Sequence, residues 1–186
     1  YKTILWTSGL STEVSYIFNL TSQDSVLRDI FQDVRFRRAM SLAIDREEIN
    51  NSLYFGKGKP IQHTVIKTSK FYKPEYADSY VEFDPERAKA LLNEMGLVDQ
   101  DGDGWRERPN GEDLMLILEY SSSENPLREG NAELVTEYWK EVGINIKLKL
   151  ISGELWAQRI DGNSINVTLN DGWDGTDIFF PIRAFW

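Results

Sequence analysis

The chain has 186 residues, 41% of them hydrophobic, and a formal net charge of −9. This length suits one domain, and the mean hydropathy of −0.44 is ordinary for a globular protein. The excess of carboxylates argues against nucleic acid or an anionic membrane surface as partner, because phosphate binding rests on clustered Lys and Arg. The chain holds no cysteine, which excludes disulfides, thiolate nucleophiles and iron–sulfur sites. No apolar run approaches the ~20 residues that span a bilayer.

The first part of the chain predicts two strands and a polar connection. Aromatic and β-branched residues, separated by Ser8 and Gly9, predict strands at 1–7 and 13–20. The stretch 21–32 is polar, and we expect a connecting loop there.

Two helices that meet at one hinge residue are predicted over 33–55. Asp33 is placed to cap the first, and Asp45 ends it and caps the second, with Glu48 three residues on to complete a capping box. Gly56 suits the end of the second helix. Arg37 lies at the edge of the buried stripe, and we expect it to form a structural ion pair. The stripe itself has helical spacing: Phe36, Ala39, Met40, Ala43 and Ile44.

The stretch 56–80 lacks clear periodicity. Its glycines and lysines at 56–59 do not have the spacing of a phosphate-binding loop, so we interpret them as a turn. We expect 61–80 to be an extended surface segment, and long irregular segments are often functional. A helix follows, because Asp84 and Pro85 form a strong start and Gly96 with Leu97 a Schellman ending.

An acidic turn lies at 99–107, where carboxylates alternate along the chain at Asp99, Asp101 and Asp103. This spacing matches the beginning of a calcium-binding EF-hand loop. The twelfth position is Asn110, where that loop requires a bidentate Glu, and a strand is predicted to follow in place of a helix. We interpret the segment as a polar turn, with Ca²⁺ as the alternative; a calcium-binding interaction module is a further function class.

The second half predicts a β–α–β unit. The stretch 114–120 is nearly continuously apolar, as in a strand covered on both faces. The stretch 126–142 predicts a helix with Trp139 in the core, and 144–150 alternates as a strand with one solvated face. Two strands joined through a helix are expected to be parallel. A short helix at 154–160 and a strand at 165–169 complete the predicted elements.

Three segments resemble the large extracellular solute-binding proteins of the peptide/nickel type, which deliver ligands to ABC importers. The first is Asp33-x-x-Phe36-Arg37-x-Ala39-x-x-x-Ala43-Ile44-Asp45-Arg46, the second runs from Asp84 to Leu97, and the third from Tyr138 to Ile144. The resemblance implies an α/β lobe like that of periplasmic binding proteins, with a mixed sheet flanked by helices, half of a type II clamshell. We therefore expect 1–186 to be a single lobe, a fragment of a two-lobed protein.

The resemblance also places a ligand site after the last strand. Peptide-binding members have W-x-x-D-Y-x-x-P there, where the Asp accepts the ligand's α-amino group. This chain has Trp173, Asp174 and Asp177, with the Trp-to-Asp spacing one residue longer and the Tyr missing. An oligopeptide is the first expected ligand. An oligosaccharide is the alternative, because aromatic rings stack on sugars and Trp and Asn groups bind hydroxyls; Trp156 and Asn170 join the candidate site for that reason.

An enzyme is the rival class. A glycoside hydrolase needs a carboxylate pair, but nothing singles out such a pair, and His63 stands without a nucleophile motif. We expect no catalysis and no cofactor. The resemblance further implies ABC permease subunits as partners and a periplasmic or extracellular location, with a lipoprotein anchor in some relatives.

Overall fold

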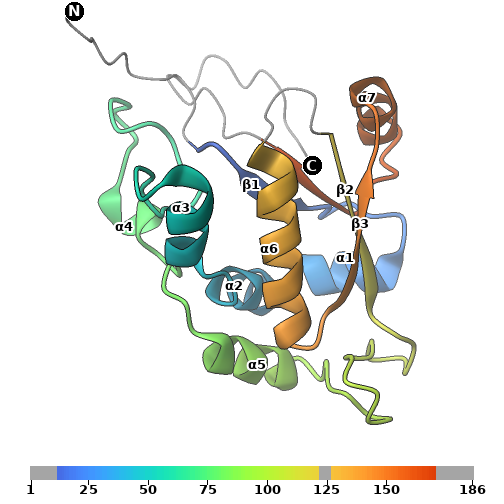
Figure 1. The fold of residues 1–186 in the computed structure, drawn as a ribbon. Coiled ribbons are helices and arrows are strands. Elements are labelled where there is room, and N and C mark those ends of the chain that lie inside the picture. Colours follow the sequence, from blue (N-terminus) through green and yellow to red (C-terminus); the bar gives the residue numbers. More distant parts are fainter. Residues whose placement is uncertain (1–11, 122–126, 171–186) are drawn as a thin grey trace, which may run out of the picture.

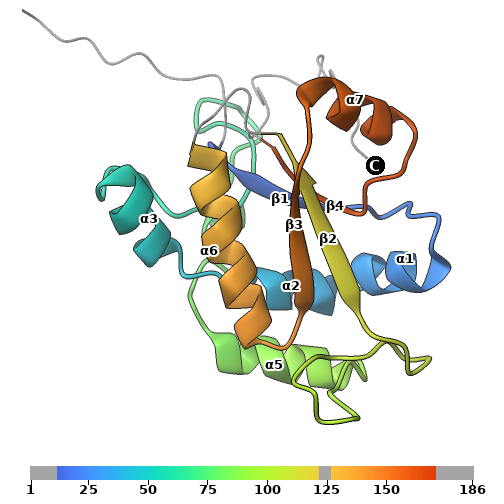
Figure 2. The same ribbon diagram turned by 45° about the vertical axis from the view of Figure 1, so that its right-hand side comes forward.

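The computed structural model describes residues 12–121 and 127–170, which form an open four-stranded sheet with helices packed against it (Figures 1 and 2). In chain order the elements are β1 Ser15–Phe18, α1 Ser25–Gln32, α2 Val34–Leu42, α3 Arg46–Tyr54, α4 Pro74–Ala77, α5 Pro85–Glu94, β2 Met115–Tyr120, α6 Leu127–Glu141, β3 Asn145–Leu150, α7 Gly153–Asp161 and β4 Val167–Asn170. The strand predicted at 1–7 lies outside the described residues. Within the described ranges, no helix is long and apolar enough to cross a membrane.

The sheet is mixed, as predicted, with the strand order β1-β4-β2-β3. β2 runs parallel to both β3 and β4, and β1 runs antiparallel to β4. The predicted β–α–β unit is therefore confirmed as β2–α6–β3. Figure 1 shows α6 beside the sheet, α2 and α3 alongside α6, and α5 below them.

The core lies between the sheet and the helices α2 and α6. Trp139 of α6 is fully buried, as predicted, and its ring lies 5.6 Å from that of Phe18 on β1, measured between centroids. Phe18 in turn contacts the rings of Phe31 and Phe36 at 5.4 and 5.3 Å. Packed aromatic rings supply much of the buried apolar area that holds a domain of this size together.

The predicted caps are confirmed. Asp33 accepts from the backbone N–H of Arg35 over 2.8 Å, and Asp45 accepts from that of Glu48 over 2.9 Å. Asp84 caps α5 in the same way. The predicted Schellman ending of α5 is also present, since the N–H of Leu97 donates to the carbonyl of Leu92 over 3.1 Å.

Two side chains near these caps act differently from the prediction. Arg37 donates to the backbone carbonyl of Phe31, at the end of α1, and among the described residues no ion pair is formed by it. Glu48 does not close a capping box; its Oε2 accepts the phenolic proton of Tyr138 over 2.6 Å. Both side chains therefore connect helices to one another, a use that local sequence does not reveal.

The loop predicted for 21–32 is wrong, because α1 occupies most of it. Asp24 caps this helix by accepting from the N–H groups of Val26 and Leu27. Leu27, Ile30 and Phe31 are buried on one face. Three apolar residues at helical spacing are enough to give this helix a buried face, although the surrounding sequence is polar.

The strands are less covered than predicted. Met115 and Ile117 of β2 are 41% and 40% exposed, so the face of the strand that carries them is open to solvent within the described part of the chain. On β3 the predicted alternation holds for Ile146, which is buried, but Leu150 is 54% exposed. The prediction failed here because the sequence of a strand shows only which side chains are apolar. Whether those side chains are buried depends on which neighbouring elements cover each face of the sheet.

The long segment 61–80 is irregular, as predicted, apart from the single turn α4. Its two ends are joined to each other, because the N–H of Gln62 donates to the carbonyl of Ala77 over 2.7 Å. The Gln62 side chain reaches the hydroxyl of Ser41 on α2. Ala77 is fully buried, so this segment is anchored at both ends.

Candidate functional site

The carboxyl ends of β2 and β4 lie together at one end of the sheet, because these strands are parallel neighbours. The guanidinium of Arg128, in the first turn of α6, connects them. It donates to the carbonyl of Ser121 over 3.2 Å and to Oδ1 of Asn170 over 3.4 Å. Arg128 is 4% exposed and Ser121 6% exposed. This end of the sheet is where open α/β sheets bind ligands.

Of the five predicted ligand contacts, Trp156 and Asn170 fall in the described part of the chain. Asn170 is the last residue of β4 and faces Arg128 as just described. Trp156 lies on α7, and its indole N–H donates to the hydroxyl of Thr168 on β4 over 2.8 Å. Thr168 and Asn170 are two residues apart on β4, so Trp156 contacts the strand that ends at Asn170. Trp173, Asp174 and Asp177 lie outside the described residues.

Glu119 is a residue of this region that the sequence analysis missed. It is 3% exposed, on β2, and its carboxylate binds Lys149 of β3 at 2.6 Å and Arg159 of α7 at 2.7 Å. Arg159 donates through both Nε and a terminal nitrogen. A lone acid within an apolar strand was the available signal, and register places it opposite Lys149. The network attaches α7 to the sheet by charge.

A cavity of about 790 Å³ lies beside β1, the strand at one end of the sheet order. Its wall comes from β1, α2, α3 and the stretch 58–63, and it includes Trp139. His63 lies in this wall, with Nδ1 3.1 Å from the hydroxyl of Ser15 and 3.5 Å from that of Thr12. Desolvation by the surrounding wall lowers the pKa of the His63 imidazole. Among the described residues no carboxylate hydrogen-bonds to this ring, so the arrangement lacks the third member of a catalytic triad.

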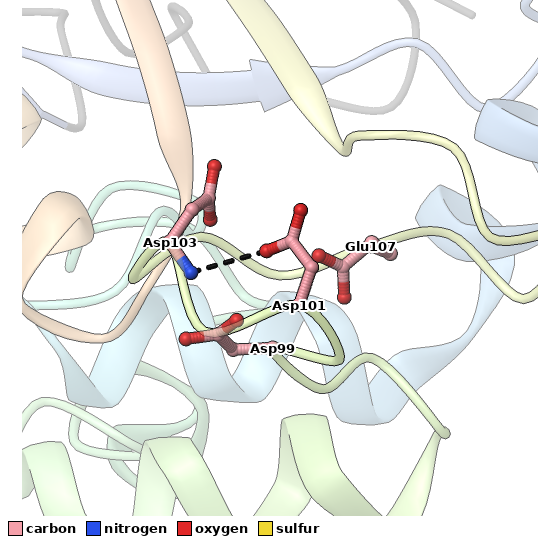
Figure 3. Close-up of side chains that lie close together, drawn as sticks. All are labelled: Asp99, Asp101, Asp103 and Glu107. Atoms are coloured by element: carbon pink, nitrogen blue, oxygen red, sulfur yellow. Dashed lines mark hydrogen bonds between the residues drawn. The ribbon is translucent and has the colours of Figure 1, made fainter.

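The acidic turn brings together the three predicted carboxylates and a fourth, Glu107 (Figure 3). One carboxylate oxygen from each lies within 4.8 Å of the others. Asp99 accepts from the N–H groups of Gly102 and Gly104, over 2.7 and 3.0 Å. Asp101 accepts from the N–H of Asp103 over 3.1 Å. These hydrogen bonds stabilise the turn from within. Its carboxylate oxygens are also ligands of the kind that Ca²⁺ prefers.

Glu107 differs from the other three because it is 5% exposed, and its Oε2 accepts from the N–H of Gln100 over 2.7 Å. Glu107 belongs to the same series of alternate positions as the three aspartates, although Trp105 interrupts the series, and this could have indicated its place in the cluster. β2 follows this turn, so the second helix of an EF-hand is replaced by a strand.

Comparison with known proteins places the chain in a family. The family model for the middle portion of bacterial extracellular solute-binding proteins, family 5, matches residues 2–181. A probable ABC transporter-binding protein from Deinococcus radiodurans is 29% identical over 136 residues, which is 73% of this chain and 23% of that protein. Curated relatives of this kind are matched over 23 to 26% of their length, so the chain spans about a quarter of them.

Solved structures agree with this assignment. The oligopeptide-binding protein OppA superposes with a TM-score of 0.87 and 31% identity, over 95% of this chain and 28% of that one. A periplasmic oligopeptide-binding protein from Thermotoga maritima, solved with bound mannohexaose, gives a TM-score of 0.68 and 26% identity, over 87% of this chain and 30% of that one. The predicted mixed α/β fold of the periplasmic-binding-protein type is thereby confirmed. The chain belongs to family 5 of the bacterial extracellular solute-binding proteins.

Proposed function

We propose that the protein containing this chain captures an oligopeptide outside the cytoplasm and delivers it to an ABC importer. The observation that carries this proposal is the family match over residues 2–181. The likeness to OppA, an oligopeptide-binding protein, favours a peptide. The 186 residues act as one lobe of a clamshell, and the ligand is enclosed when a second lobe closes over it.

The ligand contacts from this lobe are proposed at the end of β4. Asn170 offers an amide there, and Arg128 holds its side chain in place. Trp173 would supply a flat apolar surface, and Asp174 or Asp177 an acceptor for the peptide's ammonium group. Trp156 has its N–H engaged by Thr168, so it contributes ring surface only.

An oligosaccharide is the second candidate ligand. One observation favours it: the relative from Thermotoga maritima is named for oligopeptides but was solved with mannohexaose. The 173–181 segment of this chain also departs from the peptide-binding pattern, because the Tyr that follows the Asp is missing. Aromatic rings with nearby amide groups suit sugars as well as peptides.

Binding without turnover is proposed in either case. His63 is held by hydroxyl groups, and within the described ranges no carboxylate orients it. Ser15 lies within hydrogen-bond reach of this ring, but a serine–histidine pair without an orienting acid lacks the third group that such hydrolytic sites use. We also propose a periplasmic or extracellular location, with the permease subunits of the importer as partners and a lipoprotein anchor as in some relatives.

The test uses the full-length protein. Thermal-shift screening against oligopeptides and oligosaccharides comes first, followed by calorimetry on the class that raises the melting temperature. Trp173→Ala is expected to weaken binding at least tenfold, whereas the matched control Trp105→Ala, in the acidic turn, leaves affinity unchanged. Release of hydrolysis products, with no shift by either ligand class, would overturn the proposal.

A further inference from the structure

Positive charge is concentrated in one segment of this acidic chain. Between 55 and 78 there are five lysines and only two carboxylates, Glu75 and Asp78, whereas the whole chain has a net charge of −9. Asp78 lies 3.8 Å from Lys59 and is partly neutralised by it. All five lysines are exposed: Lys57, Lys59, Lys67, Lys70 and Lys73. The net charge, which argued against an anionic membrane surface as partner, thus conceals a local reversal of sign in this segment.

Aromatic rings are interleaved with these lysines. The ammonium of Lys70 lies 5.0 Å from the ring centroid of Phe71, and that of Lys73 lies 5.2 Å from the centroid of Tyr76. Phe71 is 41% exposed and Tyr76 54% exposed. These five residues, counting Lys67, are called the lysine–aromatic surface below. They present cations and apolar rings to solvent together.

The lysine–aromatic surface is mounted on a fixed base. The N–H of Tyr72 donates to the carbonyl of Ser69 over 3.1 Å, and α4 is anchored through the buried Ala77. In Figure 1, α4 lies on the other side of α6 from β2 and β3. α4, which carries Tyr76, therefore lies away from β2 and β3.

The cations of this surface are all lysines, and this indicates the kind of partner that the surface suits. The segment 47–86 contains no arginine, although arginine is the cation that forms forked bonds to single carboxylates and is enriched at protein interfaces, where lysine is depleted. Lysine is a compact point charge, suited to a diffuse layer of negative charge. Lysines with neighbouring Tyr and Phe rings are typical of the boundary between water and lipid.

We infer that the lysine–aromatic surface docks onto the headgroups of an anionic lipid bilayer, with the rings entering the interface and the ammonium groups lying among the phosphates. Attraction of about fivefold in affinity per lysine is expected. The remaining negative charge of the chain is repelled by the same membrane, so it orients the protein with this surface toward the lipid. The inference does not depend on which solute the protein binds.

The experiment is sedimentation of the ligand-free full-length protein with vesicles. Vesicles of phosphatidylcholine alone are compared with vesicles that also contain phosphatidylglycerol, at low and at physiological salt. The test variant is Lys67→Gln/Lys70→Gln/Lys73→Gln. The control is Lys89→Gln/Lys140→Gln/Lys147→Gln, which removes the same charge elsewhere. Circular dichroism verifies that both variants fold.

The expected result is salt-sensitive binding to anionic vesicles only. The affinity for these vesicles should fall about a hundredfold in the test variant and change little in the control. Phe71→Ala should lower it a few-fold at unchanged charge. The inference is wrong if the unaltered protein does not bind, or if both triple variants lose affinity equally. It is also wrong if the test variant loses affinity for the detergent-solubilised importer while its vesicle binding is unchanged, since an acidic protein is then the partner. Solute binding, measured in parallel, tests the proposed function independently.

Discussion

The indole N–H of Trp139 donates to the backbone carbonyl of Met40 over 2.9 Å, and both residues are buried. This bond joins α6 to α2 across 99 positions of sequence. It also joins two of the segments that carry the resemblance to the family. A buried hydrogen bond of this kind fixes the relative position of two helices, because a donor or acceptor without a partner in the core would lower the stability of the fold.

Trp139→Phe is expected to lower the free energy of unfolding by about 2–3 kcal/mol, because it leaves a void and removes the donor to the Met40 carbonyl. Urea denaturation followed by circular dichroism measures this. Trp156→Phe is the matched control; it removes one hydrogen bond at a partly exposed ring and should cost about 1 kcal/mol. Equal losses in the two variants would contradict the role given to Trp139.

Glu119→Gln is expected to destabilise the fold by about 2–3 kcal/mol, because a buried carboxylate that binds two cations is replaced by a neutral amide. Lys149 and Arg159 remain partly solvated, which limits the loss. Glu137→Gln, which breaks an exposed pair with Lys140, should change stability by about 0.5 kcal/mol or less. Urea midpoints for both variants give the comparison, and an effect of Glu119→Gln no larger than that of the control would refute it.

Asp33 gives a prediction about acid pH. The hydrogen bond from Arg35 lowers the pKa of the Asp33 carboxyl below its usual 3.8. The unfolded chain therefore binds this proton at a higher pH than the folded chain does. The stabilisation is complete well above pH 3.8 and is lost as the pH falls through the lowered value.

Asp33→Asn keeps a cap acceptor but removes the charge, and we expect a loss of about 1 kcal/mol at pH 7. The difference from the unaltered protein should shrink when denaturation is repeated near pH 3. A difference that stayed constant between the two pH values would show that the charge of Asp33 is not what stabilises the fold.

The acidic turn gives a prediction about hydrogen bonds. Asp99→Ala removes the acceptor for the N–H groups of Gly102 and Gly104, and we expect it to cost about 1–2 kcal/mol. Asp101→Ala removes the acceptor for one N–H and should cost less. Thermal unfolding in a chelator and in added Ca²⁺ distinguishes the two interpretations of the turn. If Asp99→Ala lowers the melting temperature equally in both solutions, the turn is held by hydrogen bonds alone. If Ca²⁺ raises the melting temperature of the unaltered protein and Asp99→Ala abolishes that rise, the turn is a cation site.

Local sequence was enough for the helix ends. Asp33, Asp45 and Asp84 were predicted as caps and are caps, because a cap depends on backbone groups two or three residues away. The apolar spacing on α2 and the buried Trp139 on α6 were also predictable, since each lies within a single helix. The resemblance to the family was carried by these same segments, which are rich in helix signals and contain none of the proposed ligand contacts.

Tertiary structure decided what depends on partners distant in sequence. The pairing of Glu119 with Lys149 and Arg159 needs the register of β2 against β3 and the placement of α7. The exposure of Met115 and Ile117 depends on which elements cover β2, and the apolar run alone did not contain that information. Residue type and spacing determine which side chains are apolar enough to be buried and which polar groups can bond to a partner a few residues away. Chain topology decides which distant groups meet, because only the folded arrangement brings their atoms within bonding distance.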